Sequence, residues 1–196
     1  MGRTPVAAGS VVAGRVAVIG AVAGVVLAGT VAACSSGGDE VAVTAPAPVG
    51  AACSPADPVL RVDAIADAVA AVEAELGGAQ RYYEINATDL LVNLFVAGDG
   101  GAEAIPFVFV GGALTSDEPL AGASGSTFAA DQLDFDPRRV TSCVAAELPD
   151  SVPTVFEVVG GPAEAVRYSV VVTSQAGGQL IVEVAPNGAV LSGDPV

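Results

Sequence analysis

The sequence contains no lysine, no histidine and no tryptophan, and all seven of its cationic residues are arginines. Without His or Lys, the chain has no Ser-His-Asp triad, Ser-Lys dyad, Cys-His pair, imidazole metal site or Schiff-base lysine. Nucleic-acid binding requires clustered Lys and Arg, which are scarce here. We therefore expect no enzyme activity, no cofactor, no metal and no nucleic-acid partner.

Acidic residues greatly outnumber basic residues in the sequence. The formal net charge is −15, and Arg3 and Arg15 contribute +2 within residues 1–33, so the remainder carries −15 − 2 = −17. A surface of this sign is a poor match for anionic lipid headgroups. Any attachment to a membrane should therefore depend on acyl chains rather than on a basic patch.

The N-terminal region has the composition of a secretory signal. Two arginines precede an uncharged run at 16–33, and small residues end that run before Cys34. The run has 18 residues, which is the minimum for a short membrane span, so an uncleaved anchor or a signal peptide without lipid is the alternative.

The motif Val31, Ala32, Ala33, Cys34 resembles the lipobox of bacterial lipoproteins. The resemblance implies cleavage before Cys34 and attachment of diacylglycerol to its sulfur, with further acylation such as palmitate. More than one acyl chain gives stable membrane anchoring. We expect a signal peptide at 1–33, a lipid-anchored flexible tether at 34–52, and a location on the extracytoplasmic face of the cell membrane.

Two cysteines remain once Cys34 is assigned to lipid. Cys53 and Cys143 form an even pair in a chain predicted to leave the reducing cytoplasm, which favours a disulfide. The alternative is two buried free thiols, since cysteine also packs as a small apolar residue.

Beyond the tether the sequence predicts the same unit twice. Apolar residues recur at helical spacing after Asp63 and again after Asp136, so each aspartate is a predicted helix N-cap. Four alternating segments with turn residues between them follow each predicted helix. We expect an α+β fold of two tandem repeats, 53–125 and 126–196. Each repeat would have one helix packed on a four-stranded antiparallel sheet.

The expected helices bury specific residues. Their apolar faces would be Ile65, Val69, Val72 and Leu76 in the first, and Val140, Cys143, Val144 and Leu148 in the second. This element order resembles the tandem αβ4 modules of the PepSY and beta-lactamase-inhibitor-protein type. The resemblance implies a module that binds or inhibits other proteins, and no inhibitory residue is carried over.

The densest acidic cluster is Asp131, Asp134 and Asp136. In an extended segment the last two point to one side, which a solvated face and a helix cap explain. A calcium site is the alternative, because Ca²⁺ takes oxygen ligands, although EF-hand spacing is absent.

Two functions follow from the sequence. We expect a non-catalytic envelope lipoprotein that binds an unknown protein partner through the exposed face of its sheets. The alternative is a carrier or sensor of an apolar or lipid ligand held between helix and sheet. An apolar cavity of several hundred Å³ would favour the carrier.

Overall fold

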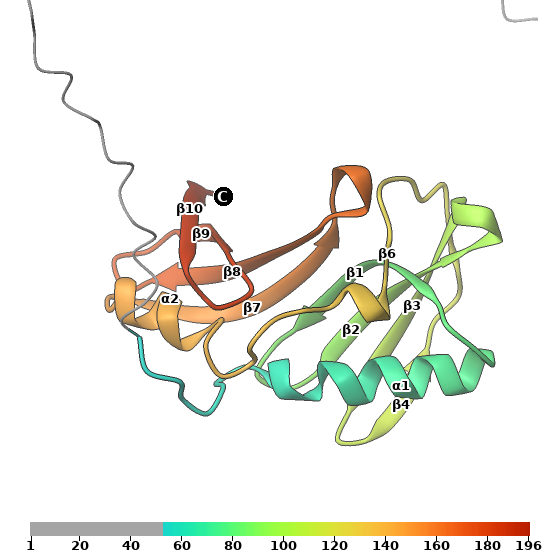
Figure 1. Cartoon of the computed structure of the whole chain (residues 1–196), viewed down its shortest axis with the longest axis horizontal. Helices are drawn as coiled ribbons and strands as arrows, with labels where there is room; N and C mark the ends of the chain where they lie inside the picture. The colour runs from blue at the N-terminus through green and yellow to red at the C-terminus, as the bar shows by residue number, and fades with distance from the viewer. Residues whose placement is uncertain (1–52) are drawn as a thin grey trace, which may run out of the picture. The chain divides into compact units, whose positions relative to one another are not determined.

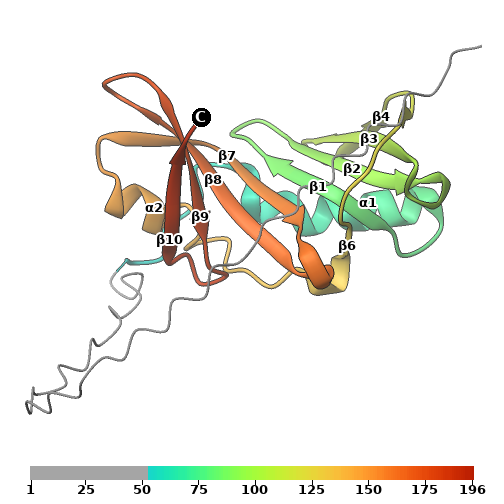
Figure 2. The same ribbon diagram turned by 90° about the horizontal axis from the view of Figure 1, so that it is seen from above.

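A computed structural model describes residues 53–196, whose strands form a ten-stranded antiparallel sheet (Figure 1, Figure 2). The predicted signal peptide and tether lie outside the described residues. No helix of the described part is long and apolar enough to span a membrane.

Eight strands define the main order of the sheet. Across the sheet they are β10 (Val190–Pro195), β9 (Gln179–Val184), β8 (Val166–Ser174), β7 (Ser151–Gly160), β1 (Arg81–Ala87), β2 (Val92–Gly98), β3 (Glu103–Val110) and β4 (Ala113–Ser116). Two short strands lie off this path, β5 (Leu120–Ala121) on β3 and β6 (Phe128–Ala129) on β1.

The predicted architecture of two helix-plus-four-strand repeats is wrong. β1 pairs with β7, with Ile85 opposite Val158, so one sheet runs across the expected boundary between residues 125 and 126. The fold is mainly β, with α1 (Ile65–Leu76) as the one long helix of the described residues. Pairing of β1 with β7 removes two open edges that separate sheets would leave unpaired.

The first helix forms where apolar residues recur at helical spacing. Ile65, Val69 and Val72 are buried, and Gly77 ends α1 in the left-handed conformation with φ 78°. Leu76 was expected on the buried face but is 40 % exposed, because it is the last residue of the helix.

The N-cap prediction for Asp63 is also wrong. Asp63 lies inside a 3₁₀ turn, Arg61–Ala64, that continues directly into α1. Ala64 takes the N-cap position, and no side chain caps the helix there. The backbone of Asp63 is already helical, so its carboxylate does not occupy the extended cap position.

The second predicted helix is much shorter than expected. α2 (Ser142–Glu147) has six residues, and turns occupy the positions before it, including Pro137. Cys143 and Val144 are buried as predicted. The Ser142 hydroxyl donates to the Arg138 carbonyl at 2.7 Å, which helps to form the first turn of α2.

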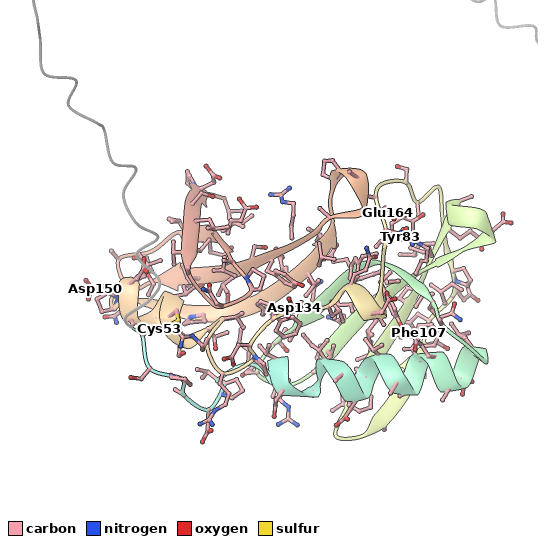
Figure 3. All side chains as sticks on the ribbon, viewed as in Figure 1. Cys53, Tyr83, Phe107, Asp134, Asp150 and Glu164 are labelled. Atoms are coloured by element: carbon pink, nitrogen blue, oxygen red, sulfur yellow. A yellow bond between two sulfur atoms is a disulfide. The ribbon has the colours of Figure 1, made fainter. Side chains whose placement is uncertain are left out.

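Both helices cover the same face of the sheet (Figure 1). Fully buried side chains such as Val72, Tyr82, Leu94 and Phe156 fill the space between these layers. In Figure 3, Phe107 lies on the α1 side of the sheet, whereas Tyr83 lies on the side away from α1. The apolar core therefore occupies one face, and the opposite face is left for other contacts.

A loop that we call the strap, residues 122–127, leads from β5 to β6 (Figure 2). A Cβ added at Gly160 would overlap the carbonyl of Ser126, so the strap packs directly against the end of β7. Only glycine allows this approach.

Candidate binding face of the sheet

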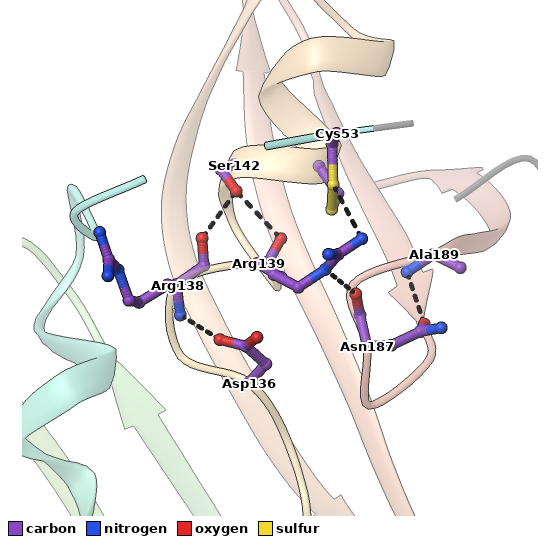
Figure 4. Close-up of a disulfide and its surroundings, with 8 residues drawn as sticks. Cys53, Asp136, Arg138, Arg139, Ser142, Asn187 and Ala189 are labelled. Atoms are coloured by element: carbon purple, nitrogen blue, oxygen red, sulfur yellow. Dashed lines mark hydrogen bonds between the residues drawn. A yellow bond between two sulfur atoms is a disulfide. The ribbon is translucent and has the colours of Figure 1, made fainter. Parts of the chain in front are cut away.

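Cys53 and Cys143 form a disulfide, as the cysteine count predicts, with Cα atoms 5.1 Å apart (Figure 4). Arg139 lies beside the bridge, and its guanidinium donates to Cys53 Sγ at 3.8 Å and to the Asn187 carbonyl at 3.0 Å. The bridge therefore fastens residue 53 to α2. Cys34, the predicted lipidation site, lies outside the described residues.

Asp136 caps a turn rather than α2 itself. Its Oδ1 accepts the backbone N–H of Arg138 at 2.9 Å (Figure 4), whereas the N-cap position of α2 belongs to Thr141. The prediction that Asp136 is a helix N-cap is therefore wrong, because its carboxylate caps a turn that precedes α2.

The acidic cluster does not converge on one point. Asp131 lies in a 3₁₀ turn, Ala130–Gln132, and the Asp134 N–H donates to the hydroxyl of Tyr168 at 3.0 Å. Among residues 53–196, no group of three or more acidic or cysteine side chains is placed to hold a metal ion.

We use the term open face for the side of the sheet opposite α1 and α2. Strand alternation places on it residues that sequence reasoning had not singled out. Register assigns to it Glu84 and Asn86 of β1, Asn93 and Phe95 of β2, Glu157 and Val159 of β7, Arg167, Ser169 and Val171 of β8, Ile181 and Glu183 of β9, and Ser192 and Asp194 of β10.

A row of mainly polar residues crosses the open face. Successive cross-strand partners are Thr115, Val108, Asn93, Asn86, Glu157, Ser169, Glu183 and Ser192. We call this set the polar row. Neighbouring members come from distant parts of the chain, so only strand pairing brings them together.

The carboxylates of this face are held by neighbouring donors. Asn86 Nδ2 donates to Glu84 at 2.6 Å, and the Ser169 hydroxyl donates to Glu157 at 3.0 Å. Glu183 accepts Arg167 Nε at 3.1 Å and the Ser192 hydroxyl at 3.4 Å. These bonds fix the positions of three carboxylates on one surface.

A cleft of about 290 Å³ lies at one end of the open face, against the strap. Its lining includes Glu84, Asn86 and Phe95 from the sheet and Ala123 and Ser124 from the strap. The Oδ1 atom of Asn86 is buried and accepts no hydrogen bond from the described residues. An amide oxygen in this state is uncommon, because buried polar atoms are nearly always paired.

Hollows on the helix side lie at its margins. One of about 320 Å³ lies at the ends of β8 and β9, with Leu148, Val172 and Leu180 in its lining. Another of about 210 Å³ lies between the start of α1 and residues 133–137. Neither occupies the space between α1 and the sheet, which core side chains fill.

Two buried tyrosines have perturbed acidity. Burial raises the pKa of Tyr82 strongly, and the negative charge of Glu73 adds to the shift. Burial also raises the pKa of Tyr168, while the hydrogen bond from the Asp134 N–H works in the opposite direction. Both lie on the helix side of the sheet and support the core.

No family model and no curated protein matches this chain. One solved crystal structure, of a "putative lipoprotein" from Clostridium difficile 630, matches with a TM-score of 0.43 and 10 % identity. The match covers 67 % of this chain and 91 % of that one.

Proposed function

We propose that this protein is a non-catalytic lipoprotein of the cell envelope that binds another protein through the open face of its sheet. The observation that carries the proposal is the uncovered face itself. It combines fixed polar groups with apolar side chains such as Phe95, Val171 and Ile181, while the helices cover only the opposite face.

The anchoring part of the proposal rests on sequence. The motif ending at Cys34 follows an uncharged run, and a disulfide-bonded domain follows the tether. Disulfides persist in oxidising compartments outside the cytoplasm. Together these features support export and attachment by acyl chains at Cys34.

Lipidation has a direct test. The wild-type protein should carry a mass increment for acyl chains on Cys34 and fractionate with membranes. A Cys34→Ala variant should lose both the mass and the stable attachment, because one cysteine sulfur carries the diacylglycerol. Retention of the variant in the membrane fraction, with no acyl mass on wild type, would contradict the anchor.

The binding face has a separate test in intact cells. A photo-cross-linking residue in place of Phe95 should form adducts with a second protein, because Phe95 lies on the open face beside the cleft. The same probe in place of Ala74, an exposed position on α1, is the matched control. Equal adducts from both positions, or none from Phe95, would reject binding through this face.

A further inference from the structure

We propose that the open face is built for a cationic partner, a protein segment whose Lys and Arg side chains reach the carboxylates on and beside the polar row. This inference rests on the proposed function, since it specifies the chemistry of the protein bound there.

The open face carries more negative than positive charge. Strand register places on it four carboxylates, those of Glu84, Glu157, Glu183 and Asp194, and two guanidiniums, those of Arg81 and Arg167. Both guanidiniums are already paired, Arg167 with Glu183 at 3.1 Å and Arg81 with Glu164 at 3.5 Å. The chain has no lysine, so no ammonium group neutralises the remaining carboxylates of the face. The electrostatic potential of the open face is therefore negative, so it attracts positive groups and repels phosphates and anionic lipid headgroups.

Three of these carboxylates are fixed before any partner arrives. Asn86, Ser169 and Ser192 each donate a side-chain hydrogen bond to the nearest glutamate, at 2.6, 3.0 and 3.4 Å. An ionised carboxylate has about four acceptor sites. One or two bonds from neighbours orient each group and leave lone pairs for an incoming donor. Fixed acceptors lose less conformational entropy when they bind.

The same region contains an acceptor that no group fills. Asn86 gives its Nδ2 donor to Glu84, which fixes the orientation of the amide, and its Oδ1 has no donor partner. Asn86 also belongs to the lining of the cleft at the strap. Because this oxygen is buried, only a donor that enters the cleft could fill it. The exposed acceptors of the face are its carboxylates, which are complementary to lysine and arginine, side chains that only donate.

Apolar residues flank the polar row on both sides. Phe95 and Val159 lie on one side, and Val155, Val171 and Ile181 lie on the other. They would contact the methylene stems of long cationic side chains, whose charged ends reach the carboxylates. Partial burial strengthens such pairs, and the side chain of Glu183 is only 35 % exposed.

The experiment uses the full-length protein in zwitterionic detergent and two short peptides, one alternating Lys and Ala and the other alternating Glu and Ala. The test variant combines Glu84→Gln, Glu157→Gln and Glu183→Gln. The control combines Asp67→Asn, Glu75→Gln and Glu147→Gln, three exposed acids on the helices that cover the opposite face. Both variants change the net charge equally, so they separate local contacts from long-range attraction.

We expect the Lys peptide to bind wild type and the control with similar dissociation constants. The test variant should bind it about tenfold more weakly, as the loss of three partly exposed ion pairs predicts. The Glu peptide should not bind. Equal weakening in both variants, or equal binding of both peptides, would overturn the inference. If the triple variant fails to fold, the three single variants provide the same comparison.

Failure of this inference is distinct from failure of the proposed function. The segment cross-linked from position 95 in cells should be rich in Lys or Arg, and the test variant should reduce its capture. Adducts with a segment that lacks such residues, unaffected by the glutamine substitutions, would reject the cationic partner and leave binding by the face intact. Absence of adducts would instead reject the proposed function.

Discussion

Tyr82 is a fully buried side chain whose hydroxyl has no hydrogen-bond partner among the described residues. Its ring packs against Phe128, with centroids 5.9 Å apart. Tyr168 is buried in the same core, but its hydroxyl accepts the Asp134 N–H. The two tyrosines thus bury the same chemical group in different hydrogen-bonding states.

We predict that Tyr82→Phe raises the free energy of unfolding by about 1 kcal/mol, because it removes an unpaired buried hydroxyl and keeps the ring. Tyr168→Phe should lower it by a similar amount, since the Asp134 N–H loses its acceptor. Urea titrations of the two variants against wild type provide the measurement. A loss of stability in Tyr82→Phe would show that its hydroxyl is paired.

The same tyrosines predict how stability depends on alkaline pH. Burial raises the pKa of both above the ordinary tyrosine value of 10.0, so the unfolded chain releases these protons first. Stability is therefore complete below pH 10 and falls as pH rises above it. Thermal unfolding of Tyr82→Phe between pH 9 and pH 11 should show a shallower fall. An unchanged slope would contradict the raised pKa of Tyr82.

At the scale of elements, the close approach of the strap to β7 depends on Gly160. A Cβ there would overlap the Ser126 carbonyl, and backbone atoms cannot move aside cheaply. We predict that Gly160→Ala costs about 1–3 kcal/mol, as overpacking does, and speeds amide exchange in the strap. Gly193→Ala is the control, because its backbone is not in the left-handed region and its Cβ would meet only the end of the Leu180 side chain, which can move aside. Equal exchange in the strap of both variants would reject the contact.

The disulfide is the covalent link between α2 and the segment before α1. Its sequence separation is 90 residues, and a loop of this size predicts a stabilisation of about 4–5 kcal/mol through restriction of the unfolded chain. Reduction should lower the urea concentration at the midpoint of unfolding by the corresponding amount. In a Cys53→Ala, Cys143→Ala variant, reductant should leave that midpoint unchanged. A change below about 1 kcal/mol would indicate that the unfolded state stays compact without the bridge.

Individual strands were predictable from alternation of apolar and polar residues. Ile85 in β1, and Val170 and Val172 in β8, are buried as their alternating patterns indicate. Strict alternation with Ile85 would also bury Tyr83, but a bulge between Tyr82 and Glu84 places Tyr82 in the core instead. Helix lengths were less predictable. The apolar spacing around Val140 and Val144 fits a helix, yet the residues before Ser142 form turns. In these turns Arg139 contacts the loop at Asn187 and Gly188. That loop is distant in the sequence, so the local pattern does not encode the contact.

At the scale of the whole molecule, sequence could not determine how the strands join. Pairing of β1 with β7 connects residues about 70 positions apart, and strand propensity contains no signal for it. The polar row depends on the same long-range register, so Glu157 and Asn86 could not be grouped beforehand. The resemblance to tandem modules predicted separate sheets, and this pairing contradicts it.

The continuous sheet predicts a single cooperative unfolding transition. A fragment of residues 53–125 would leave the β7-pairing edge of β1 open and would lose the core contributed by Phe128, Phe156 and Val158. We predict that this fragment does not fold, because about 70 residues with an open central edge bury too little apolar surface. A dispersed amide NMR spectrum of the fragment would show otherwise.

The position of the disulfide also determines which residues can resist mechanical tension. A force applied between the two chain ends passes from Cys53 directly to Cys143, so α1 and strands β1 to β6 bear no load while the bridge is closed. In single-molecule pulling, reduction should release up to about 300 Å of additional contour length, the extended length of the enclosed chain. Before reduction, the oxidised protein would extend only through β7 to β10. The residues around the cleft would then lose the packing of β7 without being pulled into an extended chain.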